Sequence, residues 1–440
     1  MAVKSTLGFE VEFFLIDSEG RVVYNADKII EASKKMAPEA AIIPEIAENM
    51  LELGSTPSTK ISESAQSLLD NLNIAVKAAS EEKTLLLPMS TYPGDFSPKM
   101  RDTGLYKIKK KLFGEKYDIT GKCVGFHLHH ALPEGSFDAT SKNLKAVLSK
   151  KTKKSLVEAY NLSIAIDPVL TTFMQSSPFY HRKHIGKDSR IIVYRGGKAL
   201  GYEEGLYSKH LQEFGELPPY ELNESDLLDM VIERYSVWKK VIRDLAPEIV
   251  DTANYESILD TAWNPVKINP HGTIELRGMD INLTSSLFSI AVAVKYLFQN
   301  VYEHALHVVP SDAGIAEYFK EEKGKLFVPP DDYVRKKLQY LSAYLGMEND
   351  SVRNYCKSFL KLAKSVMPTS SKNLLKPFEE MVEEKRTVSD QILEHAKKLG
   401  YKPGEELPKE AAEKLVLAHA NRLLDDLEKT QKLIEKHKSV

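Results

Sequence analysis

Four strand-like stretches of this chain carry ionisable side chains among apolar ones, and this feature most narrows what the chain can fold into. Alternation along a strand sends successive side chains to opposite faces of a sheet. Carboxylates are rarely buried unless they are paired or bind a metal ion. The four stretches are GFEVEFFLID (8–17), PEIAENMLELGS (44–55), GFHLHH (125–130) and TIELRGMD (273–280).

Three of these stretches place two ionisable residues on the same face of a strand. The opposite face of the first stretch begins with Phe9 and Val11, and that of the last stretch is formed by Ile274 and Leu276. Each ionisable pair therefore faces away from an apolar layer. The pairs are Glu10 with Glu12, His127 with His129, and Glu275 with Arg277.

The second stretch permits two conformations. If it is helical throughout, Glu45, Glu48 and Glu52 lie at positions i, i+3 and i+7 and share one helix face. If its MLELG segment is a strand, Glu52 points away from Leu51 and Leu53. The sequence leaves both conformations open.

Each of these patterns alone has an ordinary explanation, such as a solvated helix face or a local ion pair between Glu275 and Arg277. Their joint occurrence, with histidine and without cysteine, suits hard divalent cations such as Mg²⁺ or Mn²⁺. Several carboxylates without a carbonyl-rich loop indicate metals that are shared with a phosphate-bearing substrate, whose oxygens Arg277 would meet in a planar fork. The sequence contains no Gly-x-Ser-x-Gly elbow, no Gly-x4-Gly-Lys phosphate loop and no Gly-x-Gly-x-x-Gly fingerprint.

Composition argues against several classes of protein. The 440 residues carry 60 basic and 62 acidic side chains, and a net charge of −2 gives no general attraction to nucleic acid or to anionic membranes. Two cysteines, Cys123 and Cys356, fit a reducing cytoplasm and supply no disulfide framework or zinc site. The apolar run 281–294 ends short of the roughly 20 residues of a membrane helix, and no secretory pattern begins the chain. We therefore expect a cytoplasmic protein without nucleic-acid or membrane partners.

The hydrophobic periodicity predicts an α+β fold with two regions. Residues 1–325 read as strands and helices in mixed order, and residues 326–440 read as helical, packed on or extending the first region. The predicted helices are 26–36, 63–83, 155–175, 224–245 and 284–308, followed by 331–345, 350–366, 372–398 and 409–437.

The four stretches, in this order, resemble those of the glutamate–cysteine ligase and carboxylate–amine ligase family, in particular its second-type bacterial and archaeal branch. The resemblance covers about residues 5–300, and TIELRGMDIN with Trp263 and Pro270 before it is one of its more specific parts. It implies the glutamine synthetase-like catalytic fold, in which a curved antiparallel sheet forms half a funnel flanked by helices. Two or three Mg²⁺ ions, with Mn²⁺ as the other option, would lie on the inner face of this sheet.

The resemblance also implies roles for several residues of the four stretches. Arg277 would steady the transferred γ-phosphate of ATP and act in catalysis, and His127 would lie beside the ATP phosphates. The two predicted metal sites are Glu12 with Glu45 and Glu52, and Glu10 with His127 and Glu275.

The basic loop near 182–202 would complete the site. Arg190 and Lys198 would bind ATP together with Arg277 and His127. Arg195 and Tyr202, in YRGGKALGY, resemble an element that lies near the amino-acid substrate, and we expect Arg195 to be catalytic as well. The spacing between these two residues is one residue longer than in the family, and the role of His129 stays open.

The activity that the resemblance implies is ATP-dependent joining of a carboxylate to an amine. Glutamate would be phosphorylated by ATP, and cysteine would attack the γ-glutamyl phosphate to give γ-glutamylcysteine. A different amine or carboxylate would preserve this mechanism, because a methylene or a thiol changes binding by only about 1–3 kcal/mol. The alternatives are a metal-dependent hydrolase that uses HLHH as zinc ligands, a phosphotransferase and a binding module without turnover. A homodimer is also open.

Overall fold

A seven-stranded antiparallel sheet forms the centre of the computed structural model, which describes residues 5–102, 105–147, 149–209, 211–245, 247, 257–261, 263–304 and 306–438. The strand order is β10-β11-β5-β1-β3-β2, and β4 pairs with the second half of β1. All of the pairings within this sheet are antiparallel. The strands are β1 (Leu7–Asp17), β2 (Ile42–Pro44), β3 (Met50–Gly54), β4 (Thr84–Leu87), β5 (Gly125–Ala131), β10 (Val266–Asn269) and β11 (Thr273–Asp280).

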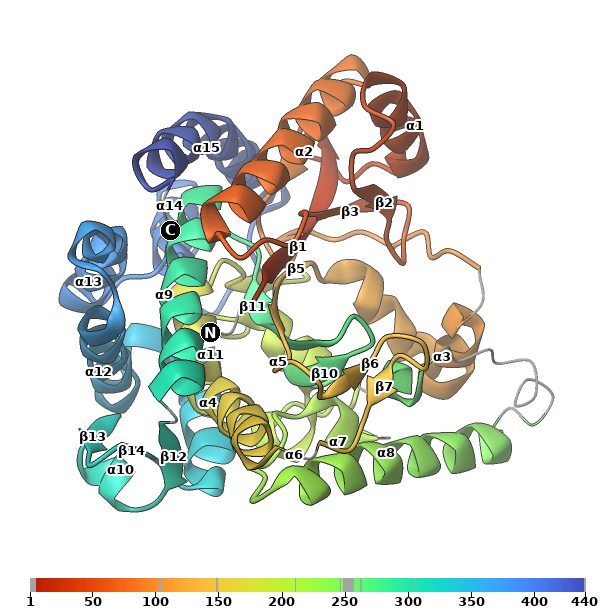
Figure 1. Cartoon of the computed structure of the whole chain (residues 1–440). Helices are drawn as coiled ribbons and strands as arrows, with labels where there is room; N and C mark the ends of the chain where they lie inside the picture. The colour runs from red at the N-terminus through yellow and green to blue at the C-terminus, as the bar shows by residue number, and fades with distance from the viewer. Residues whose placement is uncertain are drawn as a thin grey trace.

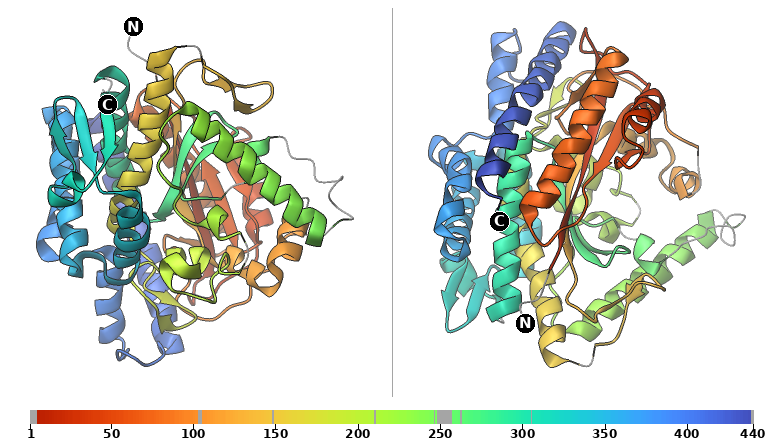
Figure 2. Two further views of the ribbon diagram at one scale, coloured as in Figure 1. Left: turned by 90° about the horizontal axis from the view of Figure 1, so that it is seen from below. Right: turned by 45° about the horizontal axis from the view of Figure 1, so that its top comes forward.

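Long helices cover the apolar face of this sheet, and other helices border its polar face (Figures 1 and 2). Phe9 of β1 lies among side chains of α2 and α9, and the ring of His130 of β5 lies 4.2 Å from that of Phe298 of α9. The polar face is bordered by α3, α5 and α8, which Figure 1 shows on the side away from α2 and α9. The helices up to residue 316 are α1 (Ala26–Met36), α2 (Ile61–Glu81), α3 (Leu105–Phe113), α4 (Lys150–Met174), α5 (Ser189–Arg195), α6 (Gly197–Leu200), α7 (Gln212–Gly215), α8 (Glu224–Leu245), α9 (Thr284–His304) and α10 (Ala313–Ala316).

Short strands form three small sheets outside the central one. β12 pairs with β14, which also pairs with β13, and the two remaining pairs are hairpins. β14 crosses the boundary at residue 325 that the sequence predicts between its two regions. These strands are β6 (Phe137–Asp138), β7 (Asn143–Leu144), β8 (Phe179–Tyr180), β9 (Lys183–His184), β12 (His307–Pro310), β13 (Lys320–Glu322) and β14 (Lys325–Val328).

The C-terminal helices share the core of the sheet region. α12 packs against α4 and α9, and α15 packs against α2, α9 and β4. One continuous cluster of buried apolar side chains runs from Leu7 to Ile434. The buried carboxylate of Asp426 in α15 accepts hydrogen bonds from the backbone N–H and the hydroxyl of Ser285, both at 2.7 Å, at the start of α9. These helices are α11 (Gln339–Leu345), α12 (Asp350–Val366), α13 (Lys376–Glu384), α14 (Val388–Lys398) and α15 (Lys409–Lys436).

The predicted α+β fold with a curved-sheet core and a helical C-terminal region is confirmed, whereas one predicted helix is wrong and one helix was missed. The predicted helix 372–398 is broken after α13, because Lys385 takes a left-handed conformation (φ 55°) and Thr387 forms a capping box with Asp390. Helix α3 was not predicted at all. The stretch 44–55 contains strand β3 and not a continuous helix. In the part of the chain that the structure describes, no helix has both the length and the apolar character needed to cross a bilayer.

Candidate active site

Hydrogen-bonded strands of the central sheet bring the four predicted stretches into register. Directly opposed residues of antiparallel strands point to the same face. Six ionisable side chains from β1, β3, β5 and β11 therefore form one ladder on the polar face of the sheet. The opposed pairs are Glu12–Glu52, Glu10–His127 and Glu275–His129.

Glu12 and Glu52 of this ladder, together with Glu45 directly after β2, form a group that we call the carboxylate cluster. One carboxylate oxygen from each lies within 4.8 Å of the others. Burial and the charge of Glu45 raise the pKa of Glu12 to about 8, although the backbone N–H of Gly125 donates to its Oε2 at 2.6 Å. Burial also raises the pKa of Glu45, and burial with the charge of Glu10 raises that of Glu52. The three negative charges therefore lack a sufficient positive partner within the protein.

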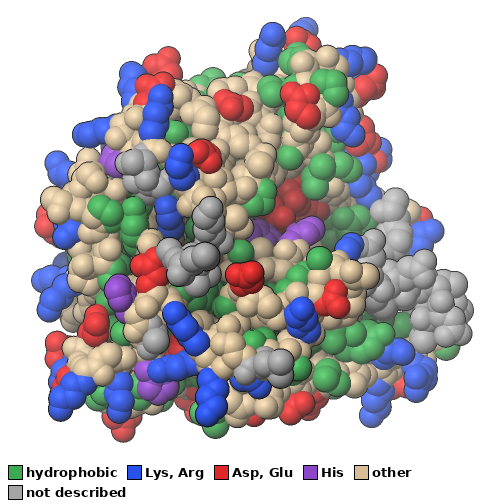
Figure 3. Space-filling view, viewed as in Figure 1, with side chains coloured by type: hydrophobic (Ala, Val, Ile, Leu, Met, Phe, Trp, Pro, Cys, Tyr) green, Lys and Arg blue, Asp and Glu red, His purple; other side chains and the backbone are tan. Residues whose placement is uncertain are grey.

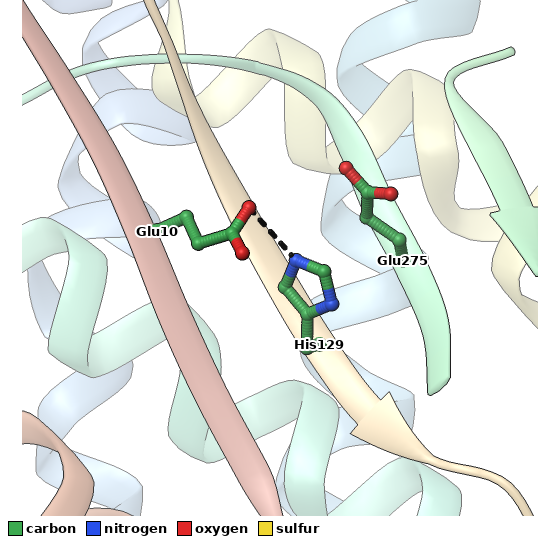
Figure 4. A group of neighbouring side chains, drawn as sticks. All are labelled: Glu10, His129 and Glu275. Carbon is green, nitrogen blue, oxygen red and sulfur yellow. Dashed lines mark ion pairs between the residues drawn. The ribbon is translucent and has the colours of Figure 1, made fainter. Parts of the chain in front are cut away.

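Glu10, His127, His129 and Glu275, which we call the histidine cluster, form the second group. Figure 4 shows the side chains of Glu10, His129 and Glu275 converging from three adjacent strands. Nε2 of His129 lies 3.1 Å from Oε2 of Glu10, and Nδ1 of His127 lies 3.4 Å from the same oxygen. Nδ1 of His127 also lies 3.6 Å from Oε1 of Glu275. The two imidazoles thus share the same carboxylates.

The charges of the histidine cluster balance one another more closely than those of the carboxylate cluster. Burial alone would raise the pKa values of Glu10 and Glu275, but the neighbouring charges outweigh it. His129 and His127 lower the pKa of Glu10, and Arg277 and His129 lower that of Glu275 to about 2. Burial lowers the pKa of His127 to about 4, whereas Glu10 raises that of His129 despite its burial.

The structure brings the members of both predicted metal sets close together and places His129 beside the second set. Glu12, Glu45 and Glu52 meet as predicted, but the imidazole grouped with Glu10 and Glu275 within 4.8 Å is that of His129. Within the histidine cluster, His127 lies nearest the carboxylate cluster, with its Nε2 3.7 Å from Oε1 of Glu12. The sequence pattern that could have placed His129 in this site is the strand alternation, which puts it on the same face as His127.

A cavity of about 120 Å³ opens at the Glu12 end of the ladder. Lys109 of α3 reaches into it, and its Nζ lies 4.2 Å from the ring centre of Trp263. Burial lowers the pKa of Lys109 to about 7. No sequence pattern singles out Lys109, because LYKIKKKLF has the pattern of any amphipathic helix. The cationic and aromatic residues that line the cavity are Tyr106, Lys109, Arg190, Tyr194, Arg195, Trp263 and Arg277.

The three arginines of the cavity have different partners. Nε of Arg277 lies 3.1 Å from Oε1 of Glu275, which holds its guanidinium between the ladder and the cavity. Nη1 of Arg195 donates to the carbonyls of Gly215 and Trp263, and burial lowers its pKa to about 10. Arg190, predicted to bind ATP, lines the cavity and donates to the carbonyls of residues 277–279 of β11.

Two residues of the predicted basic loop lie outside this cavity. Lys198 is exposed on α6, and the half-buried Tyr202 packs against the small apolar cluster of Ile191, Ile192 and Leu200. Neither side chain is among those that line the cavity. Their placement gives no support to the predicted ATP and substrate contacts of these two residues.

A groove of about 280 Å³ lies at the other end of the ladder, beyond Glu10. Figure 3 shows acidic and histidine side chains together in a central hollow of this face of the molecule. His271 and Thr273 line the groove beside His129, along with the backbone of Gly8 and Gly54. The metal-ligand candidates therefore lie between a cationic cavity and an open groove.

The residues of the ladder fit divalent cations. Six carboxylate and imidazole side chains converge there, and Nε2 of both His127 and His129 is buried without a hydrogen bond among the described residues. A buried, unpartnered nitrogen beside several carboxylates is stabilised when a cation replaces the missing partner. The pKa values of the carboxylate cluster are raised because its buried carboxylates also lack a positive partner, and a bound cation would lower them.

The comparisons with known proteins agree with this geometry. Residues 6–327 match the sequence profile of glutamate-cysteine ligase family 2 (GCS2). The chain belongs to glutamate-cysteine ligase family 2. The matched range contains every member of the carboxylate and histidine clusters, and it ends just before the C-terminal helices.

Solved structures share the fold of this family member over almost its whole length. A bifunctional glutathione synthetase from Pasteurella multocida matches with a TM-score of 0.59 and 11% identity over 97% of this chain, which spans 53% of that protein. A glutamate–cysteine ligase from Francisella tularensis, in complex with AMP, matches with a TM-score of 0.57 and 13% identity over 99% of this chain and 98% of that one. Both matches include the C-terminal helices, which lie outside the family profile. A search of the curated proteins finds no match.

Proposed function

We propose that this protein is an ATP-dependent carboxylate–amine ligase, and specifically a glutamate–cysteine ligase that forms γ-glutamylcysteine. The observation that carries the proposal is the ladder, which places two clusters of metal-ligand candidates between a cationic cavity and an open groove. Membership of the glutamate–cysteine ligase family supports the same reaction.

The reaction has two steps. A carboxylate oxygen of glutamate attacks the γ-phosphorus of ATP and ADP leaves, which gives γ-glutamyl phosphate. The amine of cysteine then attacks the acyl carbon, phosphate leaves with the bond electrons, and the amine loses a proton. Phosphoryl transfer asks an enzyme mainly for positioning and for neutralisation of negative charge. Bound Mg²⁺ would supply part of that neutralisation.

The side chains of the site suit these two tasks. Glu12, Glu45 and Glu52 would hold one Mg²⁺, and the histidine cluster would hold a second cation. Arg277 lies beside both the ladder and the cavity, where its guanidinium would stabilise the phosphoryl group during transfer. Arg195, with no carboxylate partner among the described residues, would bind the carboxylate of the amino-acid substrate in the cavity.

The open groove is the place that we assign to the nucleotide. It adjoins Glu10 and His129 and is more than twice the volume of the cavity, at about 280 Å³ against 120 Å³. The Francisella tularensis relative is described with AMP, which supports a nucleotide site in this fold. A cytoplasmic location, which the two buried free thiols favour, and a homodimer stay predictions of the sequence.

The test is phosphate release from Mg²⁺·ATP with glutamate present, measured with and without cysteine and then across a panel of amines. Release that requires both amino acids, with γ-glutamylcysteine detected by mass, would establish the proposed ligase. Release that requires another amine would preserve the mechanism and replace the acceptor. An absence of ATP turnover with every pairing would contradict the proposal.

A further inference from the structure

Three side chains away from the ladder form a hydrogen-bonded chain of amine, imidazole and carboxylate. Nζ of Lys122, just before β5, lies 3.0 Å from Nε2 of His181 in the turn between β8 and β9. Nδ1 of the same imidazole lies 3.2 Å from Oδ1 of Asp95. None of the three lines the cavity or the groove. Their order is that of a nucleophile, its general base and the group that orients the base in nucleophilic catalysis.

The hydrogen bonds of this chain leave one nitrogen of the imidazole as a proton acceptor. A lysine ammonium has only donors, so Nε2 of His181 accepts from Lys122 and the N–H at Nδ1 donates to Asp95. Burial lowers the pKa of Lys122 against the opposing charge of Asp118, and burial with the charge of Lys122 lowers the pKa of His181. The neutral imidazole can therefore take a proton from Lys122, and Asp95 would stabilise the imidazolium that results.

The turn that carries His181 is held in a backbone conformation that side chains rarely adopt. His181 and Arg182 both have positive φ, at 47° and 61°. The backbone N–H of Arg182 donates to the carbonyl of Pro93 at 3.0 Å, and its Nε donates to the carbonyl of Leu407 at 2.8 Å. The ring of Tyr180 lies 4.5 Å from the imidazole, nearly perpendicular to it. Strained backbone is concentrated at functional sites, and here it fixes the position of the imidazole.

We propose that Lys122 is an acylation site, at which its Nζ attacks the carbonyl carbon of a small acyl phosphate with His181 as general base. The side chains of His181 and Asp95 are 36% and 58% exposed, which leaves the chain open to a small solute. Lys183, exposed at the same turn, adds positive charge that attracts the phosphate group. The inference goes beyond the proposed ligase activity and does not depend on it.

The reaction replaces the charged amine by a neutral amide. The ammonium of Lys122 first loses one proton through Nε2 of His181 to water. Nζ then bonds to the carbonyl carbon, and the bond from that carbon to the phosphate oxygen breaks with its electron pair on the oxygen. A second proton leaves Nζ through Nε2 and goes to the departing phosphate. The products are an acylated Lys122 and hydrogen phosphate.

The experiment incubates the full-length protein with acetyl phosphate near neutral pH. Quantitative mass spectrometry of the proteolytic peptides gives the initial rate of acetylation at each lysine. We expect Lys122 to react roughly tenfold faster than Lys77, an exposed lysine of α2, because only Lys122 of these two lies beside a general base. A rate at Lys122 that does not exceed the rate at Lys77 would overturn the inference.

A matched pair of variants tests the imidazole. His181→Asn removes Nε2, keeps an N–H for Asp95 and is tolerated in a left-handed turn. It should slow acetylation of Lys122 roughly tenfold and leave the rate at Lys77 unchanged. His184→Asn makes the same substitution in strand β9 of the same hairpin and should preserve the rate at Lys122. Equal rates at Lys122 in the wild type and His181→Asn would contradict the role of His181.

Asp95→Asn decides the question if His181→Asn does not fold. Loss of a nearby negative charge favours the neutral, reactive form of Lys122, so a purely electrostatic role of Asp95 predicts faster acetylation. Loss of the group that orients His181 predicts slower acetylation at Lys122 and no change at Lys77. A slower rate therefore supports the inference, and an equal or faster rate overturns it. None of these measurements reads ligase turnover, so each result leaves the proposed function to its own test.

Discussion

At the scale of single residues, Glu12 joins the two halves of the site. It lies opposite Glu52 in the sheet, borders the cavity and is 3.7 Å from His127. Its pKa of about 8 in the metal-free protein means that burial and Glu45 hold the carboxyl in its neutral form at pH 7. A neutral glutamine has nearly the same shape as that protonated carboxyl. Glu12→Gln therefore tests separately how the charge of Glu12 affects the stability of the metal-free protein and how it affects turnover.

We expect Glu12→Gln to fold and to lose roughly 100-fold or more in ATP-dependent turnover, because a metal ligand with a charge is replaced by a neutral amide. The measurement is kcat for phosphate release under saturating Mg²⁺·ATP. Glu48→Gln is the matched control, since Glu48 pairs with Lys99 at 2.6 Å outside the carboxylate cluster and should keep wild-type turnover. Wild-type turnover in Glu12→Gln would remove Glu12 from the metal site.

The same variant predicts how the stability of the metal-free protein depends on pH. The pKa of Glu12 is raised in the folded state, so the stability that its neutral form provides is complete below about pH 4.5 and is lost as pH rises through about 8. Glutamine cannot ionise. The melting temperature of Glu12→Gln minus that of the wild type should therefore be near zero at pH 5 and positive at pH 9. Added Mg²⁺ should make this difference in melting temperature negative at pH 9. A difference that does not vary with pH would contradict a raised pKa for Glu12.

At the scale of the elements, an irregularity in β11 lies beside Arg277 and affects the direction of its side chain. The pairing of β11 with β5 shifts between Leu276 and Met279. The guanidinium of Arg190 donates to the three carbonyls that this irregularity exposes, at distances of 3.1 to 3.4 Å. A β-bulge redirects a side chain at the cost of ladder hydrogen bonds, and Arg190 replaces them. These contacts predict that Arg190 acts as a positioning residue for Arg277.

Arg190→Met should destabilise the protein by roughly 2–4 kcal/mol, because buried carbonyls lose their donors. We also expect kcat to fall more than KM rises, since Arg277 is misplaced while the substrate pocket remains. Added guanidinium at millimolar concentration should restore part of kcat. Arg353→Met is the control. Arg353 pairs with the exposed Asp350, and its replacement should change neither the free energy of unfolding nor kcat. A rise in KM alone would return Arg190 to the role of a direct ATP ligand.

The sequence predicted the elements whose signals are local and missed those that depend on distant partners. Alternation in 8–17 and 125–130 was sufficient to place Glu10, Glu12 and both histidines on one face. The position of Glu45 beside Glu12 depends on the pairing of β2, β3 and β1, which one segment cannot encode. The break before α14 was visible as Thr387 and Asp390 in capping-box spacing, but it falls within an otherwise helical pattern. The carbonyl partners of Arg190 lie in β11, 87 to 89 residues further along the chain, so the sequence around Arg190 does not reveal these contacts.

One buried carboxylate of α15 contacts the start of α9. Asp426 accepts from the N–H and the hydroxyl of Ser285 and from the hydroxyl of Thr284, at the first turn of α9. Asp426→Ala should lower the free energy of unfolding by roughly 2–4 kcal/mol, since buried donors lose a charged acceptor. Urea unfolding measures this loss, and the exposed neighbour Asp425→Ala should leave stability within about 0.5 kcal/mol of the wild type. Equal stability in both variants would mean that α15 is held by apolar packing alone.

At the scale of the whole molecule, the C-terminal helices complete the core of the catalytic region. The buried apolar cluster is continuous from Leu7 to Ile434, and α12 and α15 cover α4, α9 and β4. The division at residue 325 that the sequence predicts would cut β14 and expose the outer faces of α4 and α9 to water. Exposed apolar surface on that scale opposes folding of the first region alone.

A chain that ends after residue 330 should therefore be expressed as an aggregate or as a protein without cooperative unfolding. Circular dichroism during heating measures the cooperativity, with the full chain as reference. Co-expression of residues 331–440 as a separate chain should restore a soluble complex, because the contacts of α12 and α15 do not require a covalent link. A sharp, full-chain-like transition in the first fragment alone would establish residues 1–330 as an independent domain. It would then assign the C-terminal helices to a role other than completing the core.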